Sequence, residues 1–515
     1  MQLPIEVFTS DEIKLIEEDH ARNFNGHCFD LMQKAGRAVF DLLINRYPNA
    51  KEVWIFCGKG NNGGDGYIVA NLLLENSIRH RVFATGIPHE DTEARVAYEY
   101  YLRQGGCVES DLPNHGQLPS DGVISYKAPD VIVDALLGTG IESAPHGQVT
   151  NWIAYINKLN TNTVSIDVPS GVDSDTGSVP GICVCADISV CMLGLKAGLL
   201  TGDAVDYAGE VVYDSLGVDV RPYYEQFDYA ATRYPLPIVK VEYEDIRAEL
   251  PERFPSCCKS DNGKVLIVAG SLGFGGAAII CGKGALRSGA GLVKVALDKE
   301  NYQALLSVHP ELMTADLNDP KAILKSASWA DVIAVGPGLG TDERAASILA
   351  HLDDIADKYL VYDADALTLL SMYEQNYYHE NRIITPHPGE AARLLNCSVD
   401  EVNSDRLSAC YKLWQKYGGV VLLKGAGSIV CDGKCLTIIN EGSPALATGG
   451  SGDLLTGIIA SLSAQGLSLE MSAVVGACVH AKAGELCALN YGTIGCLPTD
   501  VSLYVMELIN GRKSV

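Results

Sequence analysis

A glycine-rich loop near the C-terminus, Gly449-Gly450-Ser451-Gly452-Asp453, combines an anion-binding backbone with a carboxylate. Its glycines allow consecutive N–H groups to face one ligand, and the apolar residues that follow predict a helix whose positive end favours phosphate. A carboxylate repels phosphate, so Asp453 requires a chemical explanation here. We interpret Asp453 as a general base that takes the proton from a hydroxyl group as it attacks phosphorus. The loop therefore predicts phosphoryl transfer.

Five more loops in the C-terminal half directly follow apolar runs that predict strands. They span residues 270–278, 336–340, 363–367, 385–390 and 424–428. Because the carboxyl ends of parallel strands share one edge of a sheet, we expect these loops to meet the loop that carries Asp453.

The N-terminal half has a glycine motif of its own, in which Gly58, Gly60 and Gly63 follow the predicted strand 53–56. This G-x-G-x-x-G spacing lets a backbone approach pyrophosphate. A hydride-transferring NAD domain also needs an acidic residue about 20 positions later, at the end of the next strand. That strand ends Ala84-Thr85-Gly86. The sequence therefore disfavours hydride transfer and remains compatible with nucleotide binding.

Oxygen-bearing side chains follow three predicted strands of this half. Asn62, Asp134 and Ser170 stand in loops that should converge at one edge of a parallel sheet. Each alone is typical of a turn or a helix cap, but together they suit a hard cation beside a phosphate-binding backbone.

Strand-like runs alternate with helical patterns through most of the chain, which predicts an α/β fold with parallel sheets. Thr9-Ser10-Asp11-Glu12 matches a capping box at the start of an N-terminal helix. A proline-bearing segment without a glycine motif separates the two halves. We predict one domain over 1–227, a linker and domain entry over 228–259, and a second domain over 260–515.

Composition excludes several classes of function. A net charge of −25 disfavours nucleic acid and anionic membranes as partners. We see no targeting segment and no apolar run of the ~18 residues that cross a bilayer, so we expect a cytoplasmic protein. The spacing of the 16 cysteines suggests neither disulfides nor a metal site, and we expect reduced thiols.

The motifs of the N-terminal half, residues 61–66, Asp134 with 138–140, and 167–171, resemble the NAD(P)H-hydrate epimerase family over about residues 1–225. The resemblance implies a Rossmann-like three-layer sandwich that interconverts the R and S epimers of hydrated NAD(P)H and binds K⁺. It implies that Asn62, Asp134 and Ser170 hold K⁺, and that Asp167 is a catalytic carboxylate. The implied substrate contacts are Asn61, Asn62, Gly63, Gly64, Asp65, Gly138, Thr139, Gly140, Ile141, Glu142, Ser143, Ala144 and Asp167. The family often has a basic residue after Gly140, whereas residues 141–147 here include no Lys or Arg.

The loops 387–390, 424–427 and 449–453 resemble the NAD(P)H-hydrate dehydratase family, which has a ribokinase-like three-layer fold, over about residues 245–510. The resemblance implies that a nucleotide phosphate is spent to dehydrate the S epimer, with Asp453 as base. The adenine nucleotide would contact Lys424, Gly425, Ala426, Gly427, Ser428 and Gly452. The part of the site that binds the hydrated cofactor, called the hydrate side below, would be lined by Ala277, Gly338, His387 and Asp453. Glu390 would orient Mg²⁺ through water. Members fused to an epimerase are typically ADP-using, although the local residues do not separate ADP from ATP.

The sequence thus predicts a bifunctional repair enzyme that acts on NADHX and NADPHX and yields NAD(P)H, AMP and phosphate. We expect a homo-oligomer. One alternative is a ribokinase-like hydroxyl kinase, which would release a stable phosphorylated alcohol. Another makes the N-terminal half a non-catalytic binding or assembly module.

Overall fold

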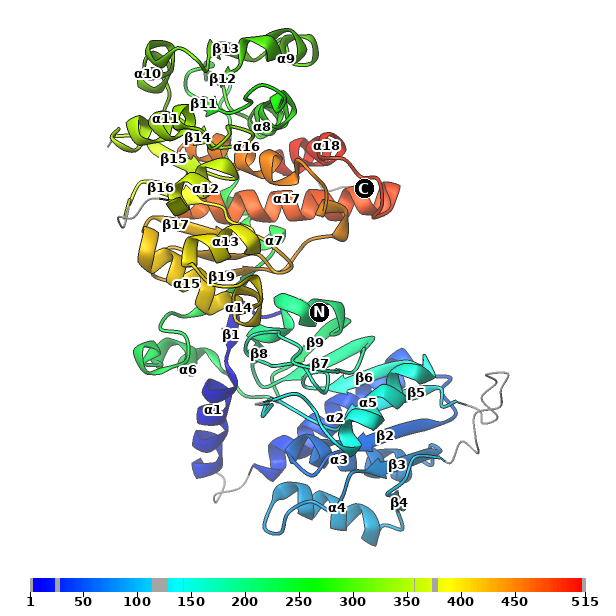
Figure 1. Cartoon of the computed structure of the whole chain (residues 1–515). Helices are drawn as coiled ribbons and strands as arrows, with labels where there is room; N and C mark the ends of the chain where they lie inside the picture. The colour runs from blue at the N-terminus through cyan, green and yellow to red at the C-terminus, as the bar shows by residue number, and fades with distance from the viewer. Residues whose placement is uncertain are drawn as a thin grey trace. The chain divides into compact units, whose positions relative to one another are not determined.

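A computed structural model describes residues 3–23, 28–113, 128–141, 143–355, 357–372 and 378–511. The chain forms two compact units, Met1–Ile238 (unit 1) and Val239–Val515 (unit 2), drawn from blue to green and from green to red in Figure 1. The division falls inside segment 228–259, which the sequence predicts as linker and domain entry. Each unit is a sheet covered by helices, so the predicted α/β class with three layers in each half is confirmed.

Unit 1 contains a 7-stranded parallel sheet in the order β4-β3-β2-β5-β6-β7-β9. Its strands are β2 (Val53–Cys57), β3 (His80–Ala84), β4 (Val108–Glu109), β5 (Val131–Ala135), β6 (Asn162–Ile166), β7 (Ile188–Met192) and β9 (Glu210–Asp214). Helices α2 (Phe29–Arg46), α3 (Asn61–Glu75) and α4 (Glu93–Arg103) share a core with one face, and α5 (Gln148–Leu159) packs on the other. The chain reverses its winding direction between β2 and β5, which is where open α/β sheets bind ligands.

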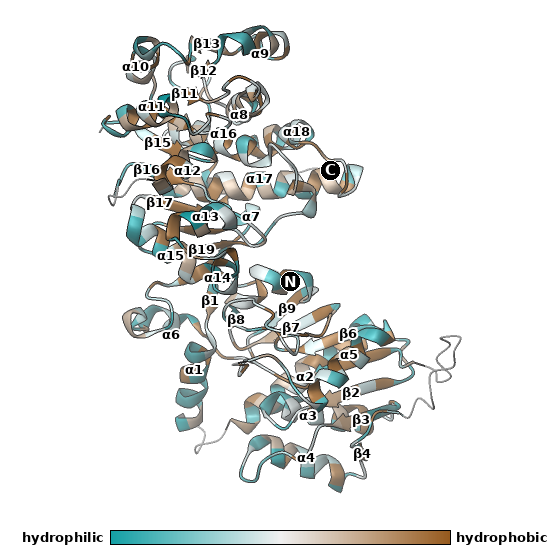
Figure 2. Cartoon of the chain, viewed as in Figure 1, coloured by the Kyte–Doolittle hydropathy of each residue, from teal (hydrophilic) through white to brown (hydrophobic). Residues whose placement is uncertain are grey.

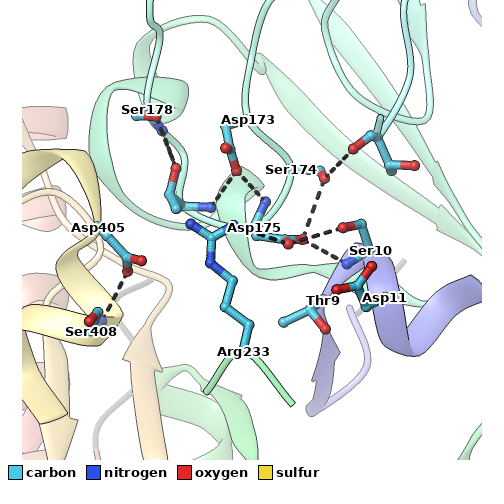
Figure 3. A network of polar contacts seen from close by, with 12 residues as sticks. Thr9, Ser10, Asp11, Asp173, Ser174, Asp175, Ser178, Arg233, Asp405 and Ser408 are labelled. Carbon is cyan, nitrogen blue, oxygen red and sulfur yellow. Dashed lines mark hydrogen bonds and ion pairs between the residues drawn. The ribbon is translucent and has the colours of Figure 1, made fainter. Parts of the chain in front are cut away.

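The N-terminal helix α1 (Ser10–Asn23) follows β1 (Glu6–Phe8), which pairs with β8 (Leu195–Lys196). The predicted capping box is confirmed, because the Thr9 N–H donates to Glu12 Oε2 at 2.7 Å and the Glu12 N–H donates to Thr9 Oγ1 at 3.4 Å. Asp175, in the loop after β6, accepts from the Ser10 N–H at 2.6 Å and from Ser10 Oγ at 3.0 Å (Figure 3). Arg233 approaches the same carboxylate at 3.5 Å. These contacts fix the start of α1 against a loop of the sheet edge.

Unit 2 contains strands in the order β13-β12-β11-β14-β15-β16-β17-β18-β19-β10. Pairing is parallel from β13 to β17 and antiparallel for β17-β18-β19. The strands are β10 (Ile238–Val241), β11 (Lys264–Val268), β12 (Leu292–Leu297), β13 (Met313–Asp316), β14 (Val332–Val335), β15 (Tyr359–Tyr362), β16 (Arg382–Ile384), β17 (Val420–Leu423), β18 (Ile429–Cys431) and β19 (Leu436–Ile439).

Helices α8 (Gly275–Arg287), α16 (Ser451–Ala464) and α17 (Leu469–Tyr491) form one core with alternate strand residues such as Val265 and Ile267. The other helices are α6 (Arg221–Gln226) in unit 1 and, in unit 2, α7 (Tyr243–Ile246), α9 (Tyr302–Val308), α10 (Pro320–Trp329), α11 (Glu343–Asp353), α12 (Asp365–Met372), α13 (Pro388–Leu395), α14 (Val399–Ser404), α15 (Arg406–Tyr417) and α18 (Pro498–Ile509). In Figure 2 the central strands are largely brown and α1 is largely teal, as expected for buried strands and an exposed helix face.

Helices α8 and α16 touch through glycine. A Cβ on Gly457 would lie 2.0 Å from the Cys281 carbonyl oxygen, and one on Gly284 would lie 2.4 Å from the Leu454 carbonyl oxygen. Any side chain at either position would separate the two helices.

Two expectations about composition need correction. Cys487 and Cys496 form a disulfide that joins the end of α17 to the segment before α18, so not all thiols are free. A separation of 9 residues resembles no standard motif, which is why the sequence did not reveal the pair. Helix α17 is long and apolar enough to cross a membrane, contrary to the sequence expectation; 72% of its most apolar window is buried inside the structure, as in a core helix.

Candidate active sites

A cavity of about 1100 Å³ opens in unit 1 at the carboxyl ends of β2, β5 and β6. The predicted substrate residues that line it are Asn61, Asn62, Asp65, Gly138, Thr139, Gly140, Ile141, Ser143, Ala144 and Asp167. Helix α1 contributes Lys14 and Glu17 to the lining. The three strand-end loops therefore converge as the sequence predicts.

Two predicted contacts have a different position. Gly63 and Gly64 are buried in the first turn of α3 and are not among the residues that line the cavity. A Cβ on Gly63 would lie 2.2 Å from the Gly58 carbonyl oxygen, and one on Gly64 would lie 2.6 Å from Met32 Cε. Their lack of a side chain allows the loop and α2 to approach α3. Glu142 lies outside the described residues.

Asp167 follows β6 with φ +66°, a left-handed conformation that is uncommon for a residue other than glycine and is often found at functional sites. Its carboxylate forms an ion pair with Lys196, which is 1% exposed and also donates to the Met192 carbonyl oxygen at 2.6 Å. Burial lowers the pKa of Lys196, but attraction by Asp167 outweighs this and leaves that pKa raised. Lys196 is thus a buried cation that pairs directly with the Asp167 carboxylate.

Asp65 faces the same group of charges. Burial raises the pKa of Asp65 well above its ordinary value, and the negative charges of Asp167 and Glu17 add to the effect while Lys196 opposes it. Burial likewise raises the pKa of Glu17. The cavity therefore holds two carboxyl groups in different settings: Asp167 forms an ion pair with Lys196, whereas Asp65 favours its protonated form. Such a pair suits acid–base chemistry.

The three predicted cation ligands lie close together, with Asn62 lining the cavity and Asp134 and Ser170 absent from its lining. Asp134 is fully buried and accepts from Ser170 Oγ at 2.6 Å and from the Ser170 N–H at 2.9 Å. Ser170 Oγ also approaches the Leu137 carbonyl oxygen at 3.2 Å, and Asn62 Nδ2 donates to that oxygen at 2.6 Å.

The same group of oxygens lacks a positive charge. Within the described ranges, no Lys or Arg forms an ion pair with Asp134, and burial raises the pKa of its carboxyl group. A buried carboxylate among neutral oxygens fits a monovalent cation, which would supply the missing charge.

In unit 2 the Gly449–Asp453 loop leads into α16, with Gly450 at φ +92° before the first helical residue. Burial raises the pKa of Asp453 to about 6, with Asp363 adding to the effect and Lys424 opposing it. Asp453 thus titrates near neutral pH, as a general base should. The Ser451 hydroxyl lies 3.4 Å from Nε2 of His480, whose pKa burial lowers to about 4, so this histidine is neutral.

Lys424 forms a buried ion pair beside this loop, with Nζ 2.6 Å from Asp363 Oδ1. Thr456, on α16, donates to the other Asp363 oxygen at 2.8 Å. Burial lowers the pKa of Lys424, but the attraction of Asp363 and Glu390 outweighs it and that pKa is raised. A Cβ on Gly452 would lie 3.2 Å from Lys424 Nζ, so the lysine meets the phosphate loop directly.

Glu390 and His387 stand at the start of α13 in a capping box. The His387 N–H donates to Glu390 Oε2 at 2.8 Å, and Lys424 Nζ is 3.8 Å from the same oxygen. Burial raises the pKa of Glu390 to about 7, with Lys424 opposing the effect. A carboxyl group so poised fits a place near a divalent cation, which would favour its ionised form.

The remaining predicted residues of unit 2 fall into two groups. Ala277 and Gly338 are neighbours, because a Cβ on Gly338 would lie 3.3 Å from Ala277 Cβ. The predicted nucleotide loop 424–428 closes on itself where Ser428 Oγ donates to the Gly425 carbonyl oxygen at 3.0 Å. Beneath it, Arg406 donates to the Lys424 carbonyl oxygen at 3.2 Å.

The sequence alone indicates no specific role for Lys196, Asp363 or Arg406. One signal was present, since Asp363 directly follows the strand β15. Their pairing depends on contacts between distant segments, which a single sequence does not show.

The fold and the two sites are those of a two-unit α/β enzyme with acid–base groups in one unit and a phosphate loop in the other. A model of the NAD(P)H-hydrate dehydratase family matches residues 265–507, and a model described as YjeF-related protein N-terminus matches residues 28–198.

Full-length relatives agree with both models. A bifunctional NAD(P)H-hydrate repair enzyme of Escherichia coli (strain K12) is 38% identical over 512 residues, 99% of this chain and 95% of the relative. One from Vibrio cholerae is 39% identical and covers 99% of each chain. A solved structure of a hypothetical protein from Streptococcus mutans aligns with TM-score 0.50 and 26% identity over 53% of this chain and 98% of its own. The chain belongs to the family of bifunctional NAD(P)H-hydrate repair enzymes, which confirms the predicted family and favours it over a hydroxyl kinase.

Proposed function

We propose that unit 1 epimerises hydrated NAD(P)H through Asp65, Asp167 and Lys196. Asp65, in its protonated form, donates its proton to the hydroxyl oxygen on the hydrated ring carbon as the carbon–oxygen bond breaks. The ring nitrogen supplies the electron pair, which leaves a cationic ring and one water molecule. The Asp167 carboxylate, positioned by its ion pair with Lys196, stabilises that cation. Water adds to either face of the ring and returns the proton to Asp65.

K⁺ is the proposed ion of this unit, held by oxygens of Asn62, Asp134 and Ser170. It would neutralise the buried Asp134 carboxylate and fix the loops after β5 and β6, which carry the substrate contacts. What supports this proposal is the position of Ser170 Oγ, which lies 2.6 Å from the fully buried Asp134 carboxylate and 3.2 Å from the Leu137 carbonyl oxygen.

Unit 2 would dehydrate the S epimer by phosphorylating its hydroxyl group. Asp453 removes the hydroxyl proton, the oxygen attacks the terminal phosphorus of ADP, and the bond from that phosphorus to the bridging oxygen of AMP breaks. The new phosphate ester then leaves as free phosphate while the neighbouring ring carbon loses a proton, which gives NAD(P)H. Phosphate is a far better leaving group than hydroxide.

The nucleotide would lie on Lys424 to Ser428 and Gly452, with its phosphates at the start of α16. Mg²⁺ would accompany the nucleotide and be oriented by Glu390 through water, and it would offset phosphate charge in this step. Ala277, Gly338 and His387 would line the hydrate side.

The observation that carries the proposal is the position of Asp453, whose pKa is about 6, at a glycine-rich helix start next to Lys424. The test supplies the full chain with mixed R and S NADH hydrate and either ADP or ATP, and follows NADH absorbance and phosphate release. Complete conversion with ADP supports both activities. Conversion that stops when the S epimer is consumed would contradict the role of unit 1, and a stable phosphorylated hydrate would indicate a kinase.

A further inference from the structure

The end of strand β3 is unusual for a unit with this strand order. In dinucleotide-binding sheets wound in this way, the adenosine ribose lies over the end of the strand next to the glycine loop. An acidic residue there holds the ribose 2′-hydroxyl, whereas a basic residue accommodates a 2′-phosphate. Here β3 ends in Ala84 and is followed by Thr85, which lines the cavity, and Gly86.

Lys59 occupies the place of the missing acid. It belongs to the glycine loop between β2 and α3, yet its side chain extends across to Gly86. A Cβ on Gly86 would lie 2.3 Å from Lys59 Cε and 3.1 Å from Nζ, and Gly86 has φ +155°. A side chain at position 86 would displace the lysine from this place, and Lys59 also lines the cavity.

The charge of Lys59 is available to a ligand. The two other lysines that line the cavity are paired, Lys196 with Asp167 and Lys14 with Asp11 at 3.1 Å. In the part of the chain that the structure describes, no carboxylate forms an ion pair with Lys59. A cation with no ion-pair partner, in a chain of net charge −25, is a local attraction for an anion.

The position of the proposed catalytic residues determines how a dinucleotide substrate is oriented in the cavity. Asp167 and Lys196 lie beyond β5, on the far side of the crevice from β3. A dinucleotide with its hydrated ring at Asp167 therefore extends its adenosine half over β2 toward Thr85 and Lys59.

We propose that Lys59 binds the 2′-phosphate of NADPH hydrate and makes unit 1 favour this substrate over NADH hydrate. The inference rests on the proposed epimerase function of unit 1. It also accounts for the absence of Lys and Arg in residues 141–147, because the positive charge comes from the glycine loop instead.

The test measures kcat/KM for R/S interconversion of NADPH hydrate and NADH hydrate with the full chain. In Lys59→Gln, kcat/KM for NADPH hydrate should fall about 10-fold, as expected for the loss of one charge-assisted hydrogen bond. The value for NADH hydrate should change by less than about 2-fold. Lys51→Gln, an equal charge change at the opposite end of β2, is the matched control and should alter neither value.

Two further measurements use the same assay. Thr85→Asp restores an acid after β3 and should shift the preference toward NADH hydrate. Adenosine 2′-monophosphate should inhibit epimerisation more strongly than adenosine 5′-monophosphate, and Lys59→Gln should remove that difference.

Equal losses for both hydrates in Lys59→Gln would overturn the proposal, because they would place Lys59 at the shared pyrophosphate. Unchanged rates for both hydrates would overturn it as well. A wild-type chain that interconverts neither hydrate would instead refute the proposed function of unit 1.

Discussion

Replacement of Asp453 by Asn separates the catalytic role of this carboxylate from its effect on stability. The variant loses the base and should lower kcat/KM for dehydration by about 10²–10⁴-fold. In the wild type, a pKa of about 6 means that about nine-tenths of Asp453 is ionised at pH 7 and about one-tenth at pH 5. Wild-type kcat/KM should therefore rise about 10-fold from pH 5 to pH 7, and the variant should lose this dependence.

Stability should change in the opposite direction. The folded-state pKa of Asp453 is raised above 3.8, so the ionised carboxylate destabilises the folded state, fully above about pH 6 and not below about pH 4. At 1.36 kcal/mol per pKa unit, Asp453→Asn should raise the free energy of unfolding of unit 2 at pH 7 by at most about 3 kcal/mol, with little gain at pH 3.

Dehydration is measured by NADH absorbance at pH 5 and pH 7. The free energy of unfolding is measured with urea at pH 3 and pH 7. Asp319→Asn is the matched control, since Asp319 starts the distant helix α10 and its side chain accepts the Lys321 N–H at 3.0 Å. It should leave dehydration unchanged. An Asp453→Asn enzyme that dehydrates at near the wild-type rate would refute the role of Asp453 as base. A variant less stable than wild type at pH 7 would refute the reasoning from burial.

Three further substitutions test the paired groups. Asp134→Ala should weaken the K⁺ dependence of epimerisation, measured by titration with KCl, and leave dehydration intact; equal loss of both activities would indicate misfolding. Lys196→Met leaves Asp167 without its cation, so epimerisation should fall by about 10²-fold or more while dehydration persists, and an unchanged rate would remove Lys196 from the mechanism. Lys424→Met leaves Asp363 buried and unpaired, which should destabilise unit 2 by about 3–5 kcal/mol and abolish dehydration but not epimerisation.

The sequence predicted the loops of the two sites better than the groups that tune them. Strand-end loops meet at one edge of a parallel sheet by geometry alone, so the positions of Asn62, Asp134 and Ser170 followed from the strand pattern. The ion pair of Lys196 with Asp167 joins residues 29 positions apart, and that of Lys424 with Asp363 joins residues 61 apart. Neither pair follows a periodicity that a single sequence reveals.

The sequence also does not show how deeply each titratable group is buried. The tendency of Asp65 to stay protonated results from the protein that surrounds it, not from residue type, and Asp65 appeared only as one contact among many. Gly63 and Gly64 were predicted to contact the substrate but have a packing role instead. A glycine-rich motif suggests ligand contact, but these two glycines serve the packing of α3 against the loop and α2. The sequence pattern is the same for both uses.

The glycine contact between α8 and α16 has a mechanical consequence. Helix α8 carries Ala277, which is proposed to contact the hydrated cofactor, in its first turn, and α16 begins at the proposed phosphate loop. Because their backbones touch at Gly284 and Gly457, neither helix can slide toward the other to bring the reacting groups together. In the proposed dehydration, this rigid frame would set the distance between hydroxyl and phosphorus, and any closing motion on substrate binding would come from loops outside this pair.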